Sequence, residues 1–73
     1  MSLAAVIGEA TAIQGYALAG ALICPAEDQD EAVAAWRSLP PDVAVVVLTE
    51  KAASWLGEAV EQRRGILPVV MRS

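Results

Sequence analysis

Residues 3–20 read LAAVIGEATAIQGYALAG, and this stretch decides the fold class. Leu3 to Ile7 is a short apolar run that ends at Gly8, a pattern typical of a buried strand. The residues after Gly8 form a tight turn and then a segment of small and apolar residues with helical character. A strand, a turn and a thin helix in this order predict the opening unit of an α/β domain.

The first helix is expected to take Thr11 as its N-cap, with Gln14 three residues later completing a capping box. Gly20 is its natural stop, so the helix is predicted to run to about residue 18 or 19. Its small side chains suit close packing against a sheet or against another protein.

Three more strands and two more helices are predicted after this unit. The strands are expected at residues 21–24, 43–48 and 67–71, and the helices from residue 28 to about 39 and from residue 50 to about 63. Val43 to Leu48 holds six apolar residues without alternation, so both faces of this strand are expected to be covered, as in parallel sheets layered by helices. Pro68 indicates that the last strand lies at a sheet edge.

Hydroxyl and carboxylate side chains mark the starts of these two helices. Asp28 is predicted to be an N-cap with Glu31 in its capping box, and Thr49 is predicted to cap the third helix, which Gly65 would end. The inner stripes are expected to be Ala32, Ala35, Trp36 and Leu39 in one helix, and Ala52, Leu56, Ala59, Val60 and Arg63 in the other.

The pattern βαβαβαβ predicts a three-layer α/β fold. Parallel strands joined by helices take right-handed connections, and the most apolar strand belongs in the centre. The expected product is a four-stranded parallel sheet of order 2-1-3-4 with its switch point between strands one and three. Residues 1–73 are interpreted as one domain, in which Met1-Ser2-Leu3 are consistent with an expression-vector remnant and carry no functional weight.

Composition excludes several classes of function. The formal net charge of −4 argues against nucleic-acid binding, which requires clustered Lys and Arg. Cys24 is the single cysteine and there is no histidine, so an intramolecular disulfide is impossible and the commonest metal ligand is missing. No stretch reaches the roughly 18 apolar residues of a membrane span, and the N-terminus lacks the basic region of a signal peptide, so direct membrane insertion is not expected.

Ligands of such sheets bind at the carboxyl ends of the strands, where Glu9 and Glu50 are placed. The first turn carries one glycine and the acid Glu9, so it fits neither a dinucleotide fingerprint nor a Walker A loop. The two acids could instead hold a cation in a receiver-like module, although acids in the first turn of a helix are also common and stabilising. No cofactor or metal site is predicted.

Four other side chains are candidates for chemistry or for contact with a partner. Cys24 is interpreted as a structural thiol, because acidic neighbours raise a thiol pKa and no histidine can activate it. Tyr16 is assigned a packing role. Trp36 is predicted to lie in the core, whereas Trp55 flanks its stripe and is either a lid over the core edge or a partner contact.

Several motifs in collinear order resemble the F subunit of V-type and archaeal-type rotary ATPases. Residues 5–9 and 11–20 are similar to the family pattern VIGD-x-x-T-x-x-G-F-x-L-A-G, with Glu9 where the family often has Asp. Val45-Val46-Val47-Leu48-Thr49-Glu50 resembles the family's I-I-L-I-T-E strand end, and Pro68-Val69-Val70 resembles its late P-V-V strand. The similarity covers nearly the whole chain.

The resemblance implies a flavodoxin-like domain in a non-catalytic central-stalk component of a proton- or sodium-translocating ATPase. It further implies binding to the coiled coil of the stalk's D subunit, indirect contact with the catalytic A/B head, and a cytoplasmic location peripheral to the membrane. The partner contacts are then expected among exposed residues near the strand ends and on the first helix: Glu9, Thr11, Gln14, Tyr16, Thr49, Glu50 and Trp55.

Two other functions stay open on the residues alone. One is the receiver-like small-ligand or phospho-signalling module, and the other is an enzyme domain that lacks its catalytic half. The family also has a C-terminal helix beyond this domain, whereas the present chain ends at Arg72-Ser73. The chain is therefore interpreted either as the N-terminal domain or as a family member without that regulatory tail.

Overall fold

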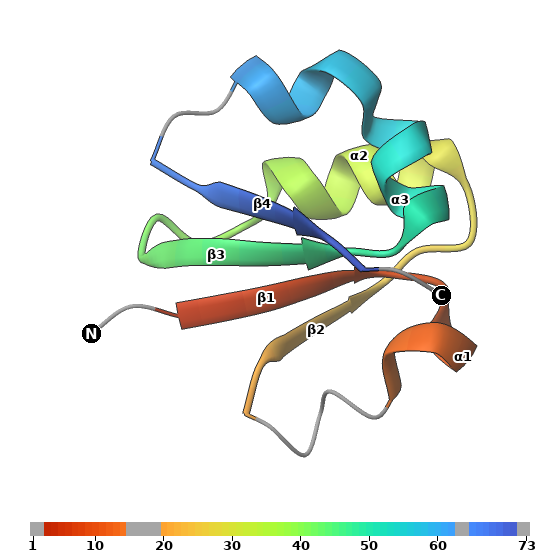
Figure 1. Ribbon diagram of the computed structural model, residues 1–73, viewed down its shortest axis with the longest axis horizontal. Helices are drawn as coiled ribbons and strands as arrows, with labels where there is room; N and C mark the ends of the chain where they lie inside the picture. The colour runs from red at the N-terminus through yellow and green to blue at the C-terminus, as the bar shows by residue number, and fades with distance from the viewer. Residues whose placement is uncertain (1–2, 15–19, 63–64, 72–73) are drawn as a thin grey trace.

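The structure is a computed structural model that describes residues 3–14, 20–62 and 65–71 (Figure 1). Its elements, in chain order, are β1 (Leu3–Gly8), α1 (Ala10–Ile13), β2 (Leu22–Pro25), α2 (Gln29–Arg37), β3 (Val43–Leu48), α3 (Glu50–Leu56), η2 (Gly57–Gln62) and β4 (Leu67–Val70).

The four strands form one parallel sheet of order β2-β1-β3-β4, which confirms the predicted topology. β3 is a central strand and β4 lies at an edge, as its Pro68 indicated. The order reverses at β1: the connection from β1 to β2 runs one way across the sheet, whereas the connections from β2 to β3 and from β3 to β4 run the other way. With right-handed connections, α1 therefore belongs on one face of the sheet and α2 and α3 on the other. Figure 1 shows α2 and α3 together and α1 apart from them, beside β1 and β2.

The main core lies between the sheet and the pair α2 and α3. Trp36 on α2 is only 4% exposed, which confirms its predicted place in the core. The cluster of buried side chains is Ala5, Ile7, Ala26, Ala32, Trp36, Leu39, Val43, Val46, Leu48, Ala52 and Leu56. Ala35, Ala59 and Val60 pack against this cluster while partly buried, as predicted for the inner stripes. α2 ends at Arg37, so Leu39 is buried just beyond the helix instead of on it, and Arg63 lies outside the described residues.

A smaller apolar contact lies on the other face. Successive side chains of a strand point to opposite faces, so Val6 is directed away from the cluster that holds Ala5 and Ile7. Val6 and Ile13 of α1 are each 1% exposed. This face therefore has its own buried centre, where α1 packs on β1 and β2.

The start of α1 corrects the predicted N-cap. The helix begins at Ala10, with Glu9 as the extended N-cap residue, and Thr11 lies exposed inside the helix. The carbonyl of Glu9 accepts from the N–H groups of Ala12 and Ile13 at 2.9 and 3.2 Å, which places the first turn two residues earlier than a Thr11 cap allows. The predicted end of this helix at residue 18 or 19 lies outside the described residues. Gly20 has a φ of +82°, as a glycine stop would require.

The third helix is shorter than predicted. α3 ends at Leu56 and the chain continues as the 3-10 helix η2, so the prediction of one helix from residue 50 to 63 was wrong. Gly57 causes the break, because its φ of +51° is incompatible with a continuing α-helix. The cap of Thr49 is confirmed, since its side chain accepts from the N–H of Ala52.

Candidate functional site

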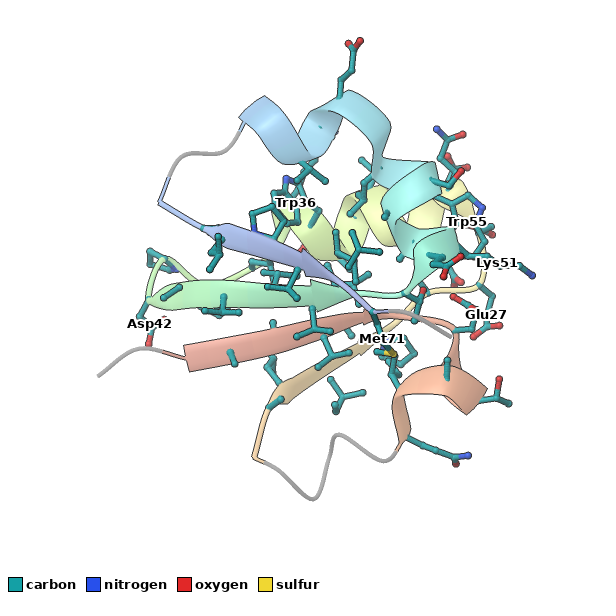
Figure 2. The ribbon with its side chains drawn as sticks, viewed as in Figure 1. Glu27, Trp36, Asp42, Lys51, Trp55 and Met71 are labelled. Atoms are coloured by element: carbon teal, nitrogen blue, oxygen red, sulfur yellow. The ribbon has the colours of Figure 1, made fainter. Side chains whose placement is uncertain are left out.

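Several polar side chains lie where the strands end at their carboxyl side. Glu27, Lys51 and Trp55 lie at this end of the molecule in Figure 2. Gly8 and Glu9 close β1, and Thr49 follows β3. This edge contains the switch point, where ligands bind in many sheets of this kind.

Thr49 joins the two central strands. Its hydroxyl donates to Oε1 of Glu9 at 2.5 Å and accepts from the N–H of Ala52 at 3.1 Å. The backbone N–H of Thr49 also donates to the carbonyl of Ile7 at 3.2 Å. A hydroxyl has one hydrogen to donate, and that of Thr49 is already donated to Glu9 within the fold. The residue is only 5% exposed, so it offers almost no surface to a partner.

Gly8 makes room for this threonine. A Cβ placed on Gly8 would press on Cγ2 of Thr49 and lie 2.7 Å from its Oγ1, and real Cβ atoms do not come so close to such neighbours. The backbone of Gly8 is otherwise ordinary, with no positive φ. The glycine is therefore required by close approach and not by a phosphate ligand.

The carboxylate of Glu9 is held in its charged form. The hydroxyl of Thr49 is the main cause that lowers its pKa, the backbone N–H of Glu9 itself acts in the same direction, and Lys51 adds a smaller attraction. Partial burial opposes these effects without reversing them. A carboxylate that is ionised and already hydrogen-bonded is poorly suited to act as a general acid.

Other acids of this edge serve the starts of helices. Oε2 of Glu27 accepts from the N–H of Ala10 at 2.8 Å, which caps α1 from a residue 17 positions away. Oδ1 of Asp28 accepts from the N–H of Glu31, and Oε1 of Glu31 accepts from the N–H of Glu27, both at 2.8 Å. Asp28 is thus the predicted N-cap, whereas the role of Glu27 was missed because it depends on the tertiary approach of two turns.

The residues predicted to contact a partner differ in how exposed they are in the structure. Thr11, Gln14 and Glu50 are exposed, and Glu9 is half-buried. Trp55 is partly buried against the core, and its carbonyl accepts from Nε2 of Gln29 at 3.2 Å. Tyr16 lies outside the described residues. Partner contact by these residues stays a prediction.

Cys24 is half-buried, and burial raises the pKa of its thiol, in keeping with a structural role. Within residues 3–14, 20–62 and 65–71, no three His, Cys, Asp or Glu side chains are grouped to hold a metal ion. The helices of the same described segments include none long and apolar enough to cross a bilayer.

The fold and this edge define a small flavodoxin-like α/β domain. At its switch point, side chains from one turn cap or bind residues of the next: Glu27 caps α1, and Thr49 binds Glu9. Comparison with protein families identifies the family: the profile of the ATP synthase (F/14-kDa) subunit matches residues 4–72. The chain belongs to this family of V/A-type ATPase subunits. A search among curated proteins gave no significant match.

Proposed function

We propose that this chain is the central-stalk F subunit of a V/A-type ATPase, a non-catalytic part of the rotor that couples and regulates rotation. It would bind the coiled coil of the D subunit and meet the catalytic A/B head only indirectly. It would work on the cytoplasmic side, held near the membrane by the rest of the complex. The observation that carries the proposal is the family match over residues 4–72.

The chemistry of the strand ends supports a non-catalytic role. Catalysis by proton transfer needs a side chain whose proton can move toward a substrate. Glu9 is ionised and bonded to Thr49, Glu27 caps α1, and burial keeps Cys24 in its thiol form. These groups stabilise the edge itself, which suits a protein that acts through contact.

The links between elements also suit a part that transmits force. The Glu9–Thr49 bond ties the ends of β1 and β3, and Gln29 ties α2 to the carbonyl of Trp55 at the end of α3. Such bonds between elements far apart in sequence oppose local opening of the edge. A rotor component needs this stiffness, because a compliant domain would yield instead of turning with the shaft.

The test is a titration of the full chain with the coiled coil of its cognate D subunit. Calorimetry and gel filtration report the complex without relying on a probe on either face of the sheet. We expect a one-to-one complex with a dissociation constant of about 1 μM or below, roughly −8 kcal/mol. An unrelated coiled coil of equal length is the control, and absence of a complex with the D subunit by gel filtration and calorimetry would overturn the proposal.

A further inference from the structure

A strip of exposed and partly exposed apolar side chains lies on the face of the sheet that carries α1. Paired residues of parallel strands share a face, so the register places Val45 with Leu67 and Val47 with Val69. All four lie opposite Val46, which points into the main core. Met71 continues the row, because it stands two residues beyond Val69 and its N–H still donates to the carbonyl of Leu48 at 2.7 Å. We name these five residues, Val45, Val47, Leu67, Val69 and Met71, the β3–β4 strip.

The strip is the less covered half of its face. The described part of α1 packs on β1 and β2, where Val6 is buried. At the other end of the same face, Leu67 is 61% exposed and Val69 is 43% exposed. Contiguous exposed apolar side chains mark a contact surface more often than scattered ones do.

The dimensions of the strip fit one helix. Two neighbouring strands are about 4.8 Å apart, and three residues of one face span about 14 Å along a strand. A helix of about 10 Å diameter covers two strands, and about nine of its residues span that length. An apolar stripe at positions i, i+3 or i+4, and i+7 would lie along the strip.

Charge at one end of the strip defines the helix further. Met71 is followed along the carboxyl edge by Thr49 and then by Glu9, whose carboxylate is held ionised and half-buried. Figure 2 shows Met71 near the end of β4, toward α1. Glu50 is exposed at the same edge. A helix whose apolar stripe is followed by Lys or Arg would place its cation beside Glu9.

A second copy of this chain fits the strip poorly. Each copy carries a formal net charge of −4 and would bring another acidic edge instead of a cation. The outer edge of β4 is no better for pairing, because Pro68 lacks the N–H that would point outward there.

We propose that the β3–β4 strip is the docking surface for a basic amphipathic helix of the stalk partner, with Glu9 as the acidic end of the site. This assignment rests on the proposed function, because it identifies the partner helix with the coiled coil of the D subunit. It goes further by naming the face of the sheet and the charge pattern that the partner presents.

The experiment compares two substitutions on opposite faces of one strand. Leu67→Asp places a charge in the strip, whereas Val70→Asp places one on the other face, since Val70 pairs with Leu48 of the core. Val70 is 51% exposed, which makes the two positions comparable. Both variants are first checked by urea unfolding, and Leu67→Thr with Val70→Thr replaces the pair if either fails to fold.

Titration of each full-length variant with the D subunit decides the proposal. We expect Leu67→Asp to weaken binding at least tenfold and Val70→Asp less than threefold, and Glu9→Gln to flatten the salt dependence of binding. If Leu67→Asp and the unchanged protein bound the D subunit equally, the β3–β4 strip would not be the docking surface, while the proposed function would stand. A complete lack of binding by the unchanged protein would overturn both. A homodimer in sedimentation that Leu67→Asp dissolves would also contradict the proposal, because the occupant would then be a second copy.

Discussion

Thr49 donates its hydroxyl proton to Glu9 at 2.5 Å across 40 residues of sequence, and the bond closes the switch point between β1 and β3. The same oxygen accepts from Ala52, so a single hydroxyl caps α3 and anchors the carboxylate that follows β1. The strand ends and the helix start are therefore parts of one hydrogen-bonded unit. A substitution at either Thr49 or Glu9 should therefore affect both the strand ends and the start of α3.

Replacing Thr49 by Val should lower the free energy of unfolding by about 1–2 kcal/mol, because the variant keeps the shape of the side chain and loses its N-cap. Urea unfolding at neutral pH measures the loss. Thr49→Ser keeps both hydrogen bonds and is the matched control. A Val variant as stable as the Ser variant would contradict the role assigned to the hydroxyl.

The same bond predicts a dependence of stability on pH. The pKa of Glu9 is lowered in the fold from its ordinary value of 4.5, mainly by the Thr49 hydroxyl. The ionised form therefore adds stability that is fully present above about pH 4.5 and is lost as the pH falls through the lower folded pKa. Thr49→Val should raise the pKa of Glu9 and reduce this acid-side loss.

Unfolding curves between about pH 3 and pH 7 check this prediction against Glu9→Gln, which has no proton to titrate at that position. Glu9→Gln should remove the part of the pH dependence of the unfolding free energy that is due to Glu9. Thr49→Val should reduce that same part. If Thr49→Val kept the whole pH dependence of the unchanged protein, another group would be responsible.

Gly8→Ala should destabilise the domain by about 1–3 kcal/mol, the usual cost of forcing extra volume into a packed site. The new Cβ would press on the side chain of Thr49. Thr49→Ser removes the methyl group and should restore part of the loss in the double variant, which a double-mutant cycle by urea unfolding would detect. Additive effects of the two substitutions would show that the contact between them is not the cause.

Glu27→Ala should loosen the start of α1, at a cost of about 0.5–1 kcal/mol for an exposed capping interaction. The bond from Ala10 to Glu27 is the side-chain cap that α1 receives, since the Glu9 side chain gives none. Hydrogen exchange should show faster exchange at Ala10 in this variant. Glu58→Ala, on an exposed acid of η2, is a control that should leave α1 unchanged.

The sequence predicted the strand order and the core because these depend on patterns along the chain. Val43 to Leu48 is apolar without alternation, and Asp28 and Thr49 stand directly before helices, so each feature could be read locally. Thr11 looked equally suitable as a cap, yet α1 begins earlier, because Glu27 reaches Ala10 from the next turn. A cap supplied from 17 residues away has no local signature.

The break at Gly57 was missed for a related reason. A glycine inside a helical pattern costs only about 1 kcal/mol relative to alanine, so the pattern alone favoured a continuous helix. The structure uses that glycine at a φ of +51° to turn α3 into η2. The β3–β4 strip was equally hidden, because strand pairing alone places Val45 and Leu67 side by side.

The edge strand β4 offers a last prediction, on self-association. Met71 donates its N–H to β3, and N–H groups alternate in direction along a strand, so residues 67, 69 and 71 face β3 while Pro68 and Val70 face outward. Pro68 has no N–H, which leaves Val70 as the outward donor of the strand and blunts the edge against pairing with another chain. Pro68→Val would add a second donor and a strong β-former.

We therefore expect Pro68→Val to keep the fold and to associate at concentrations where the unchanged protein is monomeric. Sedimentation velocity over a concentration series measures the association. Leu67→Val is the control, since it adds a β-branched side chain to the same strand without altering the outward backbone donors. If Leu67→Val associated as strongly as Pro68→Val, side-chain shape and not the missing N–H would be what keeps the edge unpaired.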